Sequence, residues 1–111
     1  MRDLEREINR LKFHQTLLLN VIRNPKAELD VIFFEKNLSE TEAHEILRLC
    51  DKLSKQYEIE KAEGYIHFQP LFNRLTMELT LKVTVKELIE ACLKQGLYVS
   101  FMKDMEKIAK N

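Results

Sequence analysis

The sequence predicts an all-α protein, a compact bundle of about five or six helices, on three observations. Only two glycines and two prolines occur in 111 residues, which leaves little material for hairpin turns and favours helices joined by short links. An amphipathic stretch at about 40–63 has a start signal and a stop signal, and a stretch at about 2–23 has a heptad pattern. The length and a hydrophobic content of 45% suit one core, so we expect a single helical domain over residues 1–111.

The long central helix is predicted at about residues 40–63. Ser39 can act as its N-cap while the Glu42 side chain reaches back to the N–H of Ser39, and Gly64 can adopt the left-handed conformation that ends a helix. The apolar residues between these signals fall on one arc of about 160°. They are Ala43, Ile46, Leu47, Leu49, Cys50, Leu53 and Tyr57. The apolar face fades after Tyr57, so we expect the last turns to project into water.

The N-terminal helix, at about residues 2–23, is apolar on two sides. Its heptad seam has 4-3-4-3-4 spacing and consists of Leu4, Ile8, Leu11, Gln15, Leu18 and Ile22. A second apolar set, Phe13, Leu17 and Val21, lies on roughly the opposite side. Such a helix needs two neighbours, and we expect one to be its own domain and the other a second copy, in a dimer or trimer whose register Gln15 sets. The alternative is that one domain wraps both faces.

Shorter helices are expected on either side of the central one. The first covers about residues 26–36, turns Leu29, Ile32 and Phe33 inward and ends at Asn37. After an extended link at 65–68, another helix begins near Pro70. Thr84 and Glu87 repeat the capping-box spacing for a helix that stops at Gly96, and a last helix covers about 97–110.

Three short stretches resemble the YhaI-like proteins, a family of small proteins from low-GC Gram-positive bacteria. They are LCDKLS at 49–54, KAEGYIHF at 61–68 and QGLY at 95–98. The resemblance extends from the first helix nearly to the C-terminus. It implies an all-helical fold, assembled from several copies, in a domain of unknown function. It implies no activity and no catalytic residue.

Histidines and cysteines are present, but their spacing in the sequence does not match that of catalytic or metal-binding sites. None of His14, His44 and His67 follows a glutamate at the three-residue spacing of di-iron bundles. Cys50 and Cys92 occupy predicted core positions, lack a partner at metal-ligand spacing and have leucines beside them, as inert buried thiols do. A disulfide is possible but disfavoured, because the N-terminal residues show no apolar core of an export signal. We therefore expect no enzymatic activity, no metal and no cofactor.

The charge pattern limits the possible partners. Lysine plus arginine equals aspartate plus glutamate at 18 each, and no window approaches the roughly 20 apolar residues of a membrane span. Three arginines at four-residue spacing alternate with carboxylates in Arg2, Asp3, Glu5, Arg6, Glu7 and Arg10. We expect a cytoplasmic, self-associating module that binds another protein as a regulatory or scaffold component. The alternative is a nucleic-acid-associated regulator that uses this arginine stripe.

Overall fold

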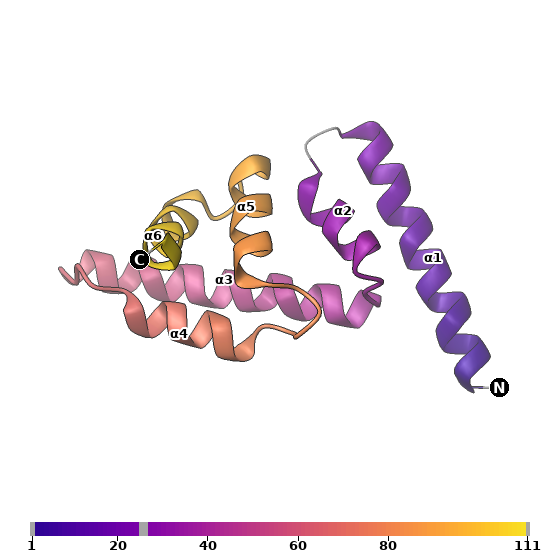
Figure 1. Cartoon of the computed structure of the whole chain (residues 1–111), viewed down its shortest axis with the longest axis horizontal. Coiled ribbons are helices and arrows are strands. Elements are labelled where there is room, and N and C mark those ends of the chain that lie inside the picture. Colours follow the sequence, from indigo (N-terminus) through magenta and orange to yellow (C-terminus); the bar gives the residue numbers. More distant parts are fainter. Residues whose placement is uncertain (1, 25–26, 111) are drawn as a thin grey trace.

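The computed structural model describes residues 2–24 and 27–110. Its helices are α1 (Arg2–Arg23), α2 (Glu28–Glu35), α3 (Glu40–Ala62), α4 (Gln69–Glu78), α5 (Val85–Gln95) and α6 (Val99–Lys110). No strand occurs within these described ranges, so the predicted all-α bundle is confirmed (Figure 1). Both predicted landmarks, the heptad-patterned first helix and the long central helix, are present.

Helix α3 is the longest element and begins with the predicted capping box. The N–H of Glu42 donates to Ser39 Oγ at 3.2 Å, and the N–H of Ser39 donates to Glu42 Oε1 at 3.0 Å. The helix ends at Ala62, and Gly64, two residues later, has φ 97°, a backbone conformation that residues with a Cβ seldom adopt. The beginning and the end of the helix therefore follow from local chemistry that the sequence already displays.

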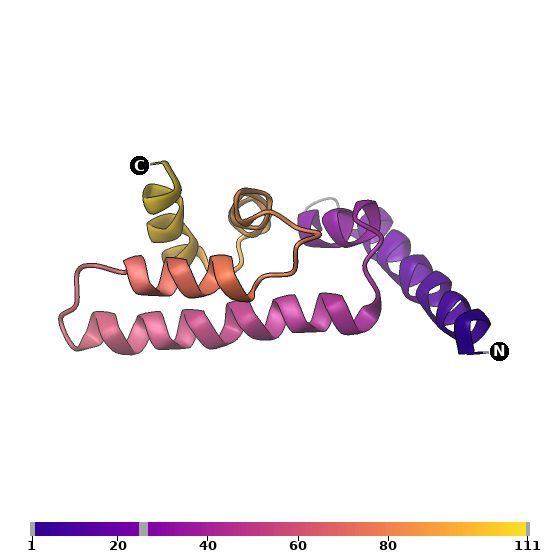
Figure 2. The ribbon, with the colours of Figure 1, turned by 60° about the horizontal axis from the view of Figure 1, so that its bottom comes forward.

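The core forms where α4, α5 and α6 cover the apolar side of α3. Helix α4 lies alongside α3 in the opposite direction, and α6 contacts both of them (Figure 2). The buried side chains of α3 are Ala43, Ile46, Leu49, Cys50, Leu53 and Tyr57, with Leu47 half-buried. Those of the covering helices are Leu71, Leu75, Leu88, Ile89, Ala91, Cys92, Phe101, Met102 and Met105. Beyond Tyr57, Ile59 is exposed, so the last turns of α3 do project into water.

The pair formed by α1 and α2 lies at one end of the molecule (Figure 1). Helix α2 packs on α5, and the N–H of Leu29 donates to Gln95 Oε1 at 3.0 Å across that contact. The molecule measures 51 × 30 × 24 Å, and its radius of gyration of 15.3 Å exceeds the roughly 13 Å of a spherical domain of this length. Helix α1 is therefore the outermost helix of an elongated bundle.

Two predicted helix starts are wrong by two residues. The second helix begins at Glu28 rather than residue 26, which itself lies outside the described residues, with Ala27 at the N-cap position. The last helix begins at Val99 rather than residue 97 because Tyr98 has φ 50°, a left-handed conformation that cannot belong to a right-handed helix. Asn37, with φ 55°, is the predicted left-handed residue after α2.

Candidate functional site

The inner face of α1 fastens this helix to the rest of the chain. Leu17 and His14 are buried, and Phe13 is half-buried. His14 Nε2 lies 2.9 Å from the carbonyl oxygen of Leu38, in the link between α2 and α3, and its ring meets that of Phe34 edge-on at 5.4 Å between centroids. Because a carbonyl only accepts, Nε2 must carry the proton. His14 therefore makes a specific polar contact in addition to its packing contacts.

The outer face of α1 carries the predicted seam, and its apolar side chains are exposed. The exposed fractions are 60% for Leu4, 43% for Ile8, 57% for Leu11, 43% for Leu18 and 77% for Ile22. Gln15, in the middle of the seam, is exposed as well. The described residues of the chain thus leave this face open, and the alternative of one domain that wraps both sides of α1 does not match them.

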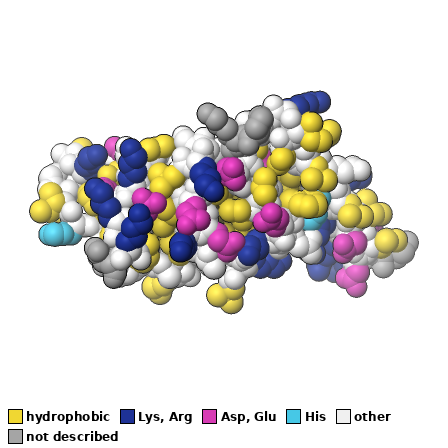
Figure 3. Space-filling model, turned by 45° about the horizontal axis from the view of Figure 1, so that its top comes forward, with side chains coloured by type: hydrophobic (Ala, Val, Ile, Leu, Met, Phe, Trp, Pro, Cys, Tyr) yellow, Lys and Arg dark blue, Asp and Glu magenta, His cyan; other side chains and the backbone are white. Residues whose placement is uncertain are grey.

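Two further apolar residues of these two helices are exposed outside the predicted seam, Leu19 on α1 and Phe34 on α2. Leu19 has an exposed fraction of 52% and adjoins the seam, and Phe34 of α2 has one of 40%. The run Leu17–Leu18–Leu19 was the available signal, because three successive leucines on a helix cannot all point toward one neighbour. Figure 3 shows hydrophobic side chains gathered over the end of the molecule that α1 and α2 form, whereas charged side chains alternate over its middle.

Charged residues flank the seam. Glu7 and Lys12 lie on either side of Leu11 and are both exposed. Among the described residues neither of them has an ion-pair partner, whereas Lys36, Lys55 and Lys82 on other elements each contact a carboxylate within 3.0 Å. An exposed apolar stripe with unpaired charges along its edges is typical of a surface that meets another helix.

The side chains that could support other chemistry are dispersed or buried. His44 is exposed and 4.0 Å from Glu40, and His67 is exposed as predicted. Among residues 2–24 and 27–110, no three His, Cys, Asp or Glu side chains gather as a metal site requires.

The two cysteines meet in the core, a contact between α3 and α5 that the sequence analysis did not foresee. Cys50 and Cys92 are free thiols, and both are fully buried. A hydrogen bond with Cys92, reinforced by burial, raises the pKa of Cys50 well above its usual range. Since the thiolate is the reactive form, Cys50 is chemically quiet.

A partly buried polar contact joins α3 to α6. The Tyr57 hydroxyl donates to Asp104 Oδ2 at 2.5 Å, and the Tyr57 ring packs against Phe68 and Phe101 at 4.7 and 5.6 Å between centroids. Burial, together with the Asp104 carboxylate, raises the pKa of Tyr57. The hydroxyl therefore stays protonated and holds the two helices together.

The fold and this surface define a small helical bundle whose first helix has one packed face and one open apolar face. No helix in the described part of the chain has the length and apolar content required to cross a membrane. Residues 1–110 match the family described as "Protein of unknown function (DUF1878)". The chain belongs to this family.

Proposed function

We propose that this protein is a non-catalytic interaction module that pairs with a second copy of itself through α1 and, as a dimer, binds a protein partner in a regulatory or scaffold role. The supporting observation is the open stripe of Leu4, Ile8, Leu11, Leu18 and Ile22 on a helix whose other face is already packed. Burial of exposed apolar surface contributes roughly 25 cal/mol per Å² of stabilising free energy. A continuous apolar stripe is therefore more stable when it packs against a matching helix than when it stays in water.

The seam itself favours a parallel pair. Its spacing places Ile8, Gln15 and Ile22 at the a positions of the heptad and the leucines Leu4, Leu11 and Leu18 at the d positions. β-Branched residues at a with leucine at d favour two parallel strands. The second copy offers the same residues, so the stripe is complementary to itself.

Polar residues support the same alignment. In a parallel, in-register pair each Gln15 faces the Gln15 of the other copy, where the two amides can hydrogen-bond to each other. Glu7, at a g position, faces Lys12 of the other copy, which is at the following e position. These two charges, which have no partner within one chain's described residues, therefore attract each other across the pair. An antiparallel pair that aligns Leu4 with Ile22 would place Gln15 against Leu11 and leave the amide without a partner.

The resemblance to YhaI-like proteins indicates where this function takes place. It supports a low-GC Gram-positive bacterium as the source and the cytoplasm as the location. Both belong to the proposal.

Light scattering on the purified protein tests the self-association. We expect twice the chain mass at micromolar concentrations, and we expect Leu11→Asp to return the mass to that of one chain while much of the helix content is retained, because a buried charge without a partner is strongly unfavourable. Leu81→Asp is the matched control, since Leu81 is fully exposed in the link between α4 and α5. A wild-type protein that keeps the mass of one chain at high micromolar concentration would contradict the proposal.

A further inference from the structure

We propose that a cleft between α1 and the start of α3 binds a phosphorylated small molecule, of the class of nucleoside di- and triphosphates. The cleft has a volume of about 800 Å³, within the usual range of small-molecule sites. Its lining residues come from α1 and from the end of the link before α3 and the first turns of α3, which lie at the same end of the molecule (Figures 1 and 2). This site shares only Lys12 with the proposed dimer seam and does not depend on it.

The charge of the cleft departs from that of the whole molecule. Arg6, Arg10 and Lys12 of α1 and Arg48 of α3 line it, and Glu40 is the one carboxylate among its lining residues. The full chain has equal numbers of basic and acidic residues. Four cationic groups that share one concave surface attract an anion with several charges more strongly than they would if dispersed.

The start of α3 adds backbone donors to these charges. Glu40 and Thr41 line the cleft and are the first two residues of α3, whose own hydrogen bonds cannot use their N–H groups. The capping box uses the N–H groups of Ser39 and Glu42, and within the described residues no hydrogen bond uses those of Glu40 and Thr41. Free N–H groups at the start of a long helix are favourable partners for phosphate oxygens.

Arg10 lines the cleft and is half-buried. Its Nε is enclosed by protein and, among the described residues, has no hydrogen-bond partner. An enclosed donor without a partner is unfavourable, and an oxyanion that accepts from the guanidinium after a small rotation of the side chain would satisfy it. Across the cleft, the one hydrogen bond of Arg48 to another described residue is a long one of 3.4 Å from Nε to the carbonyl oxygen of His44, which leaves its outer nitrogens available.

The geometry favours a small anion over a nucleic acid. The basic side chains converge on one cleft, whereas Arg2 and the acidic residues Asp3, Glu5 and Glu7 of the same helix are not among its lining residues. A long polyanion along α1 would meet those carboxylates. Phe13 and Thr16 also line the cleft and offer an apolar wall against which the base or sugar of a nucleotide can pack.

The cleft also remains open in the proposed dimer. Arg6, Arg10 and Phe13 lie on the side of α1 away from Leu4 and Leu11, at about 100° of rotation per residue. Lys12 alone borders both surfaces. Binding and self-association can therefore be measured separately.

Calorimetric titration of the full chain with inorganic pyrophosphate, and then with a nucleoside triphosphate, tests the proposal at low salt. We expect saturable binding of both compounds and a raised melting temperature. Arg10→Gln and Arg48→Gln should each weaken binding by about tenfold or more, because each removes a charged donor from the anion. Arg74→Gln is the matched control, since it removes one positive charge from α4, where Arg74 pairs with Glu78 at 3.4 Å. Leu11→Ala, which trims the seam without adding a charge, should bind as the wild type does.

Three results would overturn the proposal. The first is no saturable binding of pyrophosphate or the triphosphate at millimolar concentrations. The second is equal weakening by Arg74→Gln, which would indicate a general charge effect. The third is binding of duplex DNA that requires Arg2 as well as Arg10 and that pyrophosphate does not compete for, which would assign the arginines to nucleic acid. Circular dichroism of each variant shows whether a loss of binding reflects a loss of fold.

Discussion

His14 is the residue that most specifically holds α1 against the body of the protein. It is buried, donates to the carbonyl of Leu38 and meets Phe34 edge-on, so one side chain joins the first helix to α2 and to the link that precedes α3. The sequence placed His14 beside the seam but could not indicate this hydrogen bond. Its acceptor is a backbone atom 24 residues away, and backbone acceptors leave no trace in the pattern of side chains.

We predict that His14→Ala lowers the free energy of unfolding by roughly 1–3 kcal/mol. The change removes buried contacts and leaves the Leu38 carbonyl without its partner. Chemical denaturation, followed by circular dichroism, gives the value. His44→Ala, at an exposed position of α3, is the control and should change stability by less than about 0.5 kcal/mol. Equal effects of the two substitutions would contradict the role assigned to His14.

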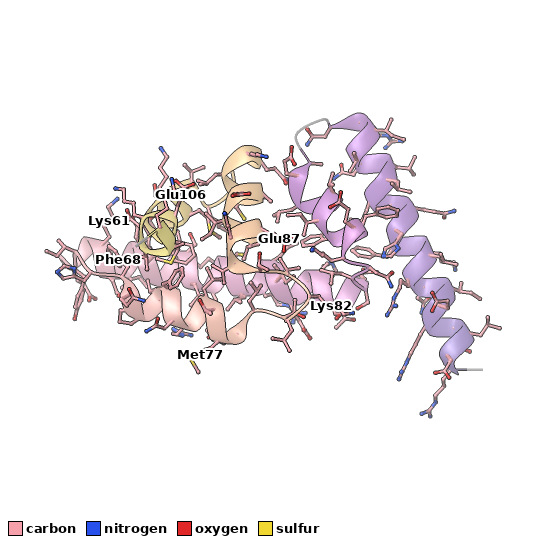
Figure 4. All side chains as sticks on the ribbon, in the orientation of Figure 1. Lys61, Phe68, Met77, Lys82, Glu87 and Glu106 are labelled. Atoms are coloured by element: carbon pink, nitrogen blue, oxygen red, sulfur yellow. The ribbon has the colours of Figure 1, made fainter. Side chains whose placement is uncertain are left out.

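Glu87 makes stability depend on pH. The salt bridge from Lys36, at 3.0 Å, and the hydrogen bonds with Thr84 hold the pKa of Glu87 below its ordinary value of 4.5 (Figure 4 labels Glu87). A carboxylate whose pKa is lower in the folded state than in the unfolded state stabilises the fold above the unfolded pKa, and this contribution is lost as the pH falls through the folded pKa. Stability should therefore decline as the pH drops below about 4.5.

The variant Glu87→Gln tests this dependence, because it cannot ionise. We expect it to be less stable than the wild type at pH 7 and to lose less stability between pH 5 and pH 3. Urea denaturation at a series of pH values measures both slopes. Identical slopes would show that Glu87 contributes nothing to the acid sensitivity.

At the scale of the element, helix ends were more predictable than helix contacts. The capping boxes of α3 and α5 were found from Ser39, Glu42, Thr84 and Glu87, because a cap depends on residues three positions apart. Gly96, with φ 77°, ends α5 as predicted. The start of α6 differs from the prediction because Tyr98 is left-handed, a conformation that nothing in the local sequence indicates.

We predict that Ser39→Ala destabilises the protein by about 1 kcal/mol, because the N–H of Glu42 loses its acceptor at the start of α3. The thermal unfolding midpoint measures the effect. Thr76→Ala serves as the control. The Thr76 hydroxyl donates to the carbonyl of Phe72 within α4, and this carbonyl keeps its backbone hydrogen bond when the hydroxyl is removed. A control that loses as much stability as Ser39→Ala would argue against the cap.

At the scale of the whole molecule, the sequence predicted the two faces of α1 but not the spaces between helices. The 4-3-4-3-4 spacing of Leu4 to Ile22 was sufficient to identify the open face, because all six positions lie on one helix. The cleft between Arg10 and Arg48 and the contact between Cys50 and Cys92 each require two elements to meet. Such contacts depend on tertiary packing, which periodicity does not encode.

The open stripe differs from the other exposed apolar residues of the bundle. Met77 points away from the body on α4 (Figure 4), and Leu81 lies in the link that follows. Single exposed apolar side chains are normal on protein surfaces, whereas a contiguous apolar surface commonly marks a contact with a partner. We therefore propose that the interaction is made through α1.

Disulfide trapping is the measurement that tests this pairing most directly. In the proposed parallel dimer, the two copies of residue 15 face each other, so Gln15→Cys should form a covalent dimer under mild oxidation at micromolar concentration. The native cysteines should not interfere, because both are fully buried. Leu81→Cys, equally accessible but away from the stripe, should remain monomeric on a non-reducing gel. A Gln15→Cys protein that forms no more covalent dimer than Leu81→Cys would contradict the account.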